Sequence, residues 1–422
     1  MSAELALAGV IAAPLLQALL VIVLSRPPGL RDVTHFAGAA VTALCAVLLL
    51  NATAQGEVAR IAVARPLPNV ELAFALEPLG ALAAMVIGGL GLLHALHTAG
   101  MVRAAKEKAP ARLMAFIALT TAASMAAAFS ANLFTFFVAY QALILASFPL
   151  VAHRGDEEAR KSARTYLAVL LAASIGLLLP AMVWTYAIAG PHEFRAGGVL
   201  GGRVDAMTAN ALLTLYVLGL AMTAIPPLHR WLPASSNAPF PAIVTIQALA
   251  VLPIGGVGIL KVAAFEFGAA LNEAVIAGRA LLVVVGVGMC GAALIALSKR
   301  DVRERLAYSV MGQSLAVVMG ALLASPIGFF AAALQVVAVA CAASTLLMAA
   351  GTTPGGDWPR NAPDYAGLGR VMPWTFAGFA LASASMIGMP PFSGAWAKLW
   401  LLTAAASVDL VWAAGLPASP RC

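Results

Sequence analysis

The sequence predicts an all-α polytopic membrane protein, and two observations carry this prediction. Of the 422 residues, 62% are hydrophobic and only 10% are charged, which is too little charge for the hydrated surface of a soluble domain. Apolar stretches recur along the whole chain, each about 20 residues long, the helix length that crosses the ~30 Å hydrocarbon layer of a bilayer. Because backbone groups in lipid must be hydrogen-bonded within the protein, we expect these stretches to be helices.

The apolar stretches define about 13 predicted transmembrane helices. The first lacks the basic segment and small-residue cleavage site of a signal peptide, so we expect it to be a span. The polar connections at 52–77, 190–206 and 352–371 are rich in glycine, proline and charge and are predicted to be linkers or surface caps. The spans are expected to begin near Leu5, Thr34, Pro78, Arg112, Asn132, Thr165, Met207, Phe240, Ala274, Arg305, Pro326, Met372 and Gly394.

Basic residues are unevenly distributed between the predicted loops. Most of the 25 lysines and arginines follow odd-numbered spans, including topology anchors at Arg300, Arg303 and Arg305. The positive-inside rule places these loops in the cytoplasm and the N-terminus outside. This bias accounts for the formal net charge of +7, so we expect no nucleic-acid partner.

No motif for a cofactor, a metal or catalysis is visible. The sequence contains no phosphate-binding glycine loop, no CxxC pair and no haem-type histidine pair. The cysteines lack metal-ligand or redox spacing and are expected to be small core residues. They are Cys45, Cys290, Cys341 and Cys422.

One short motif built on a pair of prolines occurs twice in the chain. Pro226 and Pro227, followed by Trp231, resemble Pro390 and Pro391, followed by Trp396. Paired prolines break a helix, and broken helices in corresponding halves are typical of transporters built from inverted repeats. Two unrelated proline turns at helix ends would give the same pattern.

Longer motifs around these prolines resemble those of the D-type membrane component of Mrp cation/proton antiporters. These belong to a superfamily with the proton-pumping membrane subunits of respiratory complex I (NADH:quinone oxidoreductase) and of membrane-bound hydrogenases. The motifs are Asn132 to Leu167, Gly219 to Gly268 with its PLHRWLPA turn, Lys299 to Ser309, and Gly367 to Lys398.

The resemblance implies a fold of two inverted five-helix repeats, each with a broken helix. It divides the chain into N-terminal helices and a loop (1–75), an antiporter-like core (76–393) and a short C-terminal helix with a tail (394–422). It also implies the bacterial cytoplasmic membrane as location, and other membrane subunits and the lipid bilayer as partners.

Antiporters of this family move protons along buried titratable residues near mid-membrane, whose pKa values neighbours can shift. Here every such position holds a neutral residue, and glutamine keeps the shape of glutamate without ionising. We therefore expect no central acid/base chain. The fifth- and seventh-helix positions are Gln141 and Met222, those in the eighth are Gln247 and Pro253, and those in the eleventh are Gln335, Val339 and Ala343.

Three polar residues are retained as candidates. Glu77 matches an acidic family position, although a helix N-terminus favours a carboxylate in any case. His229 lies in the proline turn, where it either gates protons or hydrogen-bonds backbone. Lys398 is either a remnant of an exit path or a side chain that extends to the interface. The six histidines are all expected at or near span ends.

The sequence leaves three alternative hypotheses for the function. The first is a subunit of an Mrp-like or complex I-like assembly that lacks the proton relay and has a structural or assembly role. The second is an active monovalent cation/proton antiporter subunit with a non-standard path. The third is a membrane-arm subunit of a quinone- or hydrogen-linked redox complex, whose redox centres would belong to partner subunits.

Overall fold

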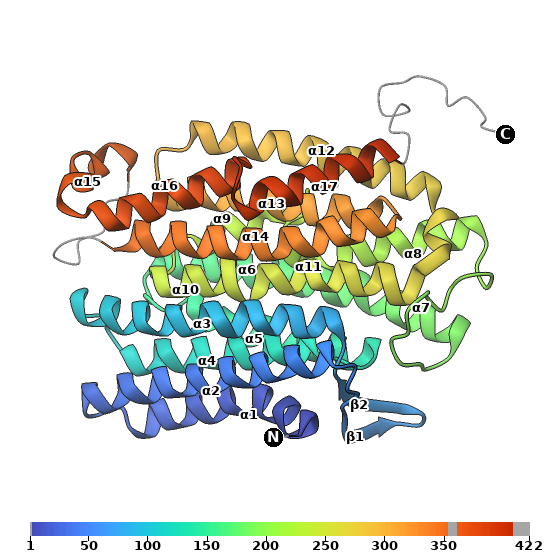
Figure 1. Ribbon diagram of the computed structural model, residues 1–422, viewed down its shortest axis with the longest axis horizontal. Helices are drawn as coiled ribbons and strands as arrows, with labels where there is room; N and C mark the ends of the chain where they lie inside the picture. The colour runs from blue at the N-terminus through green and yellow to red at the C-terminus, as the bar shows by residue number, and fades with distance from the viewer. Residues whose placement is uncertain (1, 353–360, 408–422) are drawn as a thin grey trace.

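The recurrent apolar stretches fold into long helices that lie side by side in one bundle (Figure 1). The structure is a computed structural model, and it describes residues 2–352 and 361–407. The predicted all-α fold class is confirmed. In the described part of the chain, nine helical segments are long and apolar enough to cross a membrane. The other four predicted spans correspond to α8, α13, α16 and α17, which do not meet the same criteria.

The first half of the bundle consists of nearly uninterrupted helices, several of which begin at a proline, whose fixed φ suits a first helical turn. A π-helical turn at Ser174–Leu178 joins α6 to α7. These helices are α1 (Ala3–Val23), α2 (Pro28–Ala54), α3 (Pro78–Ala104), α4 (Pro110–Ala128), α5 (Leu133–Val151), α6 (Glu157–Ala173), α7 (Leu179–Ala189) and α8 (Ala206–Gly219).

The second half is more interrupted. Its central segment consists of α10 and α11 joined by a π-helical turn at Thr245–Leu249, and another π-helical turn follows at Val262–Phe267. The helices are α9 (Trp231–Ser235), α10 (Phe240–Val244), α11 (Val251–Lys261), α12 (Val275–Ser298), α13 (Val302–Leu322), α14 (Pro326–Gly351), α15 (Leu368–Val371), α16 (Pro373–Ile387) and α17 (Ser393–Ser407).

Both proline pairs lie in non-helical connections. Pro226 and Pro227 lie between α8 and α9, and Pro390 and Pro391 lie between α16 and α17. The backbone exposed by the first break finds side-chain partners, as buried polar groups in a bilayer require. The Met222 N–H donates to the Tyr140 hydroxyl at 3.0 Å, and the Trp231 indole donates to the Ala221 carbonyl at 2.8 Å.

The α10–α11 segment forms the centre of the bundle. Its most apolar stretch is completely buried, whereas the corresponding share for α12 is 28%. Figure 1 shows α1 and α2 at one edge of the molecule and α12 at the other, with α10 and α11 between them. Residues of α10 and α11 are therefore placed where a path through the protein interior would run.

A β-hairpin at one end of the bundle is absent from the sequence prediction, which has only a linker or cap at 52–77. β1 (Arg60–Leu67) pairs antiparallel with β2 (Val70–Ala75), and Asn69 in the turn has a φ of 60°. We call this end of the bundle the hairpin end. The opposite end carries the basic loop between α3 and α4 and that between α12 and α13.

Candidate functional site

The two expected relay positions of the first half are half-buried Gln141 and buried Met222. Gln141 on α5 accepts a hydrogen bond from the Ser174 hydroxyl at 3.1 Å, at the π-helical turn between α6 and α7. Met222 is fully buried in the break after α8. Neither side chain gains or loses a proton near neutral pH, so these two relay positions carry no charge.

Gln247 occupies the centre of the molecule. It lies in the π-helical turn of the α10–α11 segment and is fully buried. Its Nε2 donates to the hydroxyls of Ser235 at 2.9 Å and Ser236 at 3.1 Å. Gln247 therefore places an uncharged, hydrogen-bonded amide in a π-helical turn, an element that is frequent at functional sites.

The remaining relay positions lie around α13 and α14. Pro253 and Val339 line a cavity of about 10 Å³ together with Ser314. Ala343 is fully buried. Gln335 donates from Nε2 to the Gln313 Oε1 at 3.0 Å. The sequence analysis did not single out Gln313, since only the fold reveals that it faces Gln335.

Glu77 acquires a partner that the sequence analysis did not assign to it. It forms an ion pair with Lys261, the last residue of α11, whose side chain is 1% exposed. Lys261 also donates to the Ser130 carbonyl at 3.1 Å and lies 5.1 Å from the centre of the Phe194 ring. A lysine buried this deeply requires such pairing, so Glu77 is a partner for a buried charge rather than only a helix N-cap.

A second buried pair joins Glu266 to His192 near the same end. Glu266 is fully buried in the π-helical turn after α11, and its Oε2 lies 3.0 Å from His192 Nε2. His192 Nδ1 lies 2.7 Å from the Gly190 carbonyl. Because both ring nitrogens face acceptors, the geometry fits the doubly protonated ring. Burial opposes this charge, but the hydrogen bond and charge of Glu266 outweigh it and raise the pKa of His192 above 6.5.

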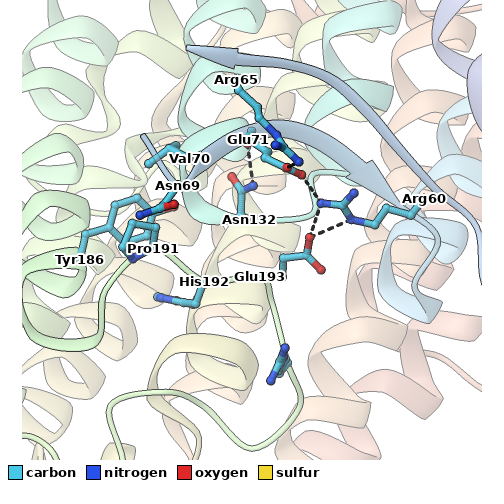
Figure 2. A pocket seen from close by; sticks show the side chains of 11 residues that line it. Arg60, Arg65, Asn69, Val70, Glu71, Asn132, Tyr186, Pro191, His192 and Glu193 are labelled. Carbon is cyan, nitrogen blue, oxygen red and sulfur yellow. Dashed lines mark hydrogen bonds and ion pairs between the residues drawn. The ribbon is translucent and has the colours of Figure 1, made fainter. Parts of the chain in front are cut away.

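A cavity of about 460 Å³ opens between the hairpin and the loop after α7. Figure 2 shows Arg60 between two carboxylates, reaching Glu71 across the hairpin and Glu193 on the loop, each at 2.5 Å. Arg65 also pairs with Glu71. The hydrogen bond from Arg60 lowers the pKa of Glu71. Arg60 therefore joins a carboxylate of the hairpin to one of the loop, which ties the two segments together.

The other two retained candidates lie apart from the buried pairs. His229 is half-buried in the turn Leu228–Arg230. Lys398 on α17 donates to the Met386 carbonyl beside the second proline break. It lines a groove of about 530 Å³ that also contains Gln313 and Arg305. Lys398 thus lines the same groove as Gln313, the partner of Gln335.

The expected topology anchors Arg303 and Arg305 contact groups in or near the loop between α12 and α13. Arg305 donates to the Lys299 carbonyl at 2.7 Å, and the Arg303 guanidinium lies 4.7 Å from the centre of the Phe240 ring. No group of three metal-ligating side chains occurs within residues 2–352 and 361–407. The cysteines Cys45, Cys290 and Cys341 are unpaired with one another, and Cys422 lies outside the described residues.

Two histidines are buried, and one of them lies far from the ends of its helix. His35 is 1% exposed and His94 is 2% exposed. His94 is ten residues from the end of α3 at Ala104, about 15 Å at 1.5 Å per residue. The expectation that every histidine lies at or near a span end is therefore wrong for His94.

The sequence and the fold are similar to those of known membrane proteins. Residues 130–419 match the family described as NADH:quinone oxidoreductase/Mrp antiporter, TM. NADH-quinone oxidoreductase subunit N of Desulforudis audaxviator is 26% identical over 382 residues, covering 89% of this chain and 75% of the relative. The D-type component of the Na(+)/H(+) antiporter of Alkalihalophilus pseudofirmus is 24% identical over 276 residues, covering 65% of this chain and 55% of that relative.

Two solved structures share the fold. A chain in the Mrp complex of Dietzia sp. has a TM-score of 0.84 and 26% identity, covering 98% of this chain and 77% of that one. A chain in the membrane-bound sulfane sulfur reductase, an archaeal respiratory membrane complex, has a TM-score of 0.81 and 23% identity, and covers 95% of this chain and 82% of that one.

Proposed function

Since the chain belongs to the NADH:quinone oxidoreductase/Mrp antiporter transmembrane family, we propose that it is a membrane subunit of an Mrp-like or complex I-like cation/proton translocating assembly. Within that assembly it is a divergent copy with a structural or assembly role. The likeness to a chain of the Mrp complex over 98% of this chain supports the assembly. The expected relay positions, which we call the central line, all hold neutral residues, and this supports the divergent role.

The hydrogen bonding along this line is the observation that carries the proposal. Gln141 and Gln335 bond to neutral partners, Ser174 and Gln313, and Gln247 bonds to two serines. Passing a proton along such a row would place the charge on an amide, which does not ionise near neutral pH. An intramembrane charge costs about 2.5–3.5 kcal/mol on insertion scales, so a copy released from pumping is stabilised by losing it.

The retained Lys398 favours a second candidate, an active antiporter subunit with a non-standard path. Its side chain lines the groove that contains Gln313, the partner of Gln335. Water in such a groove can carry ions past walls that are not ionised. The two functions differ in whether exchange depends on Lys398.

The test is sodium- or potassium-induced dissipation of a pH gradient in everted vesicles from an antiporter-deficient host. The host expresses this chain with its partner genes, either intact or as Lys398→Ala. We expect equal exchange, because the central line does not carry the protons. Lys299→Ala is the matched control, since Lys299 pairs with Glu304 on the surface.

Assembly is measured on the same membranes by native gel electrophoresis. We expect loss of the whole chain to disrupt the complex and Lys398→Ala to leave it intact. Exchange that stops with Lys398→Ala, while the complex still assembles and Lys299→Ala is active, would overturn the structural role and establish the second candidate.

A further inference from the structure

The cavity between the hairpin and the loop after α7 has a histidine in its wall that contacts a buried carboxylate. Figure 2 shows this residue, His192, on the same loop as Glu193. The His192 side chain is 13% exposed, whereas the side chain of Glu266 behind it is fully buried. Exposed Arg65 and Asn69 line the same cavity, so it is open to water at the hairpin end. His192 thus lies between that water and Glu266.

The Glu266 carboxylate depends on His192 for its hydrogen bonds. Its Oε2 lies 3.0 Å and its Oε1 lies 3.3 Å from His192 Nε2. Within residues 2–352 and 361–407, no other group donates to this carboxylate. Burying an ionised carboxylate without a partner is strongly unfavourable. A negative charge on Glu266 is therefore balanced by a positive charge on His192.

The two ring nitrogens of His192 face oxygens on opposite sides. Nδ1 lies 2.7 Å from the Gly190 carbonyl oxygen, which can only accept, so Nδ1 carries a proton. Nε2 and the Glu266 Oε2 also need a proton between them, because two lone pairs at 3.0 Å would repel. The observed arrangement therefore holds two protons. Losing either one turns a ring lone pair toward an oxygen.

The loop after α7 packs closely over the turn that carries Glu266. The N–H groups of Val199 and Leu200 donate to the Glu266 backbone carbonyl at 2.9 Å and 3.0 Å. Gly198 has a φ of 79°, and a Cβ there would lie 2.5 Å from the Phe267 carbonyl carbon. These contacts hold the loop against Glu266 without the imidazole, so the ring can change its protonation while the loop stays folded.

The charges nearest to His192 favour its protonation. Glu266 raises the pKa of His192 above 6.5, although burial and the positive charge of Arg203 on the same loop act against it. From α7 the Tyr186 ring packs edge-on, centred 5.5 Å from the His192 ring. The Tyr186 hydroxyl accepts from the Phe134 N–H at 3.0 Å. This tyrosine therefore adds no charge to the site.

The other charged groups around the site leave Glu266 to His192. Arg195 is exposed in the cavity, and the Tyr216 hydroxyl of α8 lies 2.7 Å from that of Thr185. The remaining charges form pairs, which are Arg60 with Glu71 and Glu193, Arg65 with Glu71, and Lys261 with Glu77. Since these pairs do not include Glu266, His192 is its counterion.

We propose that His192 and Glu266 form a proton-binding site at the hairpin end, which exchanges protons with water in the cavity. In the bound state the imidazolium donates from Nε2 to Glu266 and from Nδ1 to Gly190. On release, the Nδ1–H bond breaks and this proton passes to a cavity water, while the other proton stays between Nε2 and Glu266. The reverse step binds a proton. The site lies apart from the central line, so this inference does not rest on the proposed structural role.

The test is nuclear magnetic resonance of the full chain in lipid nanodiscs, with ¹⁵N-labelled histidine, titrated from pH 5 to pH 9. We expect the His192 ring to be doubly protonated below pH 6.5 and to lose one proton above it. A water-edited spectrum should show contact between water and the His192 ring, and none with His94, which is 2% exposed. Signals are assigned by their loss in His192→Gln and His94→Gln.

Glu266→Gln tests the role of the carboxylate. Glutamine keeps the shape of glutamate but carries no charge. The titration midpoint of His192 should therefore fall by about 1–3 pH units, the usual effect of losing an opposite charge in contact. Glu273→Gln is the matched control, because Glu273 is a half-buried carboxylate beyond the same turn. It should leave the midpoint unchanged.

Three results would each overturn the proposal. They are a His192 ring that is neutral at pH 6, a ring without water contact, and a midpoint that Glu266→Gln moves no further than Glu273→Gln does. The first two are measured on the intact chain, so they remain decisive if Glu266→Gln does not fold. Neither readout involves cation exchange or assembly, so this inference and the proposed function fail separately.

Discussion

At the scale of single residues, the Glu77–Lys261 pair makes the sharpest prediction about stability. Lys261 is 1% exposed, so removing its partner leaves an uncompensated buried charge. Breaking a buried ion pair costs about 3–5 kcal/mol. We expect Glu77→Gln to lower the free energy of unfolding by about 3 kcal/mol, measured by chemical unfolding in detergent.

The double variant separates pairing from packing. Glu77→Gln with Lys261→Met removes both charges, and we expect it to recover most of the loss, because apolar replacements of buried pairs are often neutral. Glu57→Gln is the matched control at an exposed carboxylate. A loss with Glu77→Gln no larger than with Glu57→Gln would contradict the role of the pair.

His192 makes stability depend on pH. Its folded pKa is raised above 6.5 by Glu266, so the pair contributes full stability below pH 6.5 and loses it as pH rises through the folded pKa. We expect the difference in free energy of unfolding between the intact chain and His192→Gln to be largest below pH 6.5. It should shrink as the pH is raised. A difference that grows with pH would show that the ring is neutral in the folded protein.

At the scale of elements, α11 approaches the broken helix closely at Gly255. A Cβ there would lie 2.6 Å from the Met222 carbonyl carbon and 2.7 Å from the Thr223 nitrogen. We expect Gly255→Ala to lower the free energy of unfolding by about 1–3 kcal/mol, the usual cost of overpacking. The measurement is the midpoint of thermal unfolding in detergent.

Gly278 on α12 provides the matched control, because an added Cβ meets nothing within 4 Å. Alanine is a better helix former than glycine by about 1 kcal/mol, so Gly278→Ala should raise the midpoint or leave it unchanged. Equal effects at the two positions would mean that α11 and the break are not in tight contact.

The sequence predicted the helices better than the contacts between them. Apolar length determines where a span lies, and the predicted starts at Pro78 and Pro326 are the first residues of α3 and α14. The pairing of Glu77 with Lys261 depends on how α3 and α11 pack, which no local pattern contains. The hairpin is short and partly exposed, so its alternation in Arg60–Leu67 was too weak a signal.

The site was predicted unevenly for the same reason. Family motifs identified Gln141 and Gln247 as neutral positions, but only the fold shows their serine partners. A small cavity lined by His35 and His94 unites five elements. Because each contributes one or two polar residues to an apolar helix, none forms a motif along the chain.

At the scale of the whole molecule, the basic loops predict the orientation in the membrane. We expect the hairpin end to face outward and the loop between α3 and α4 to face the cytoplasm, because positive charge is retained inside. In a cysteine-free background, Val58→Cys, 89% exposed before the hairpin, should react with an impermeant maleimide added to intact cells.

Lys108→Cys is the opposite reporter, since it is exposed in the α3–α4 loop. It should react only in everted vesicles. The two positions flank α3, so one span separates them. Labelling of Lys108→Cys from outside, with Val58→Cys protected, would invert the orientation.

The π-helical turn at Thr245–Leu249 gives the central segment a place where its length can vary. Such a turn closes i→i+5 rather than i→i+4 hydrogen bonds and so contains one extra residue. Deleting one residue elsewhere in a helix rotates all that follows by about 100°, at 3.6 residues per turn. Deleting one here converts the bulge to regular helix and leaves α10 and α11 in register. We therefore expect the core to tolerate the loss of one residue at this turn without refolding.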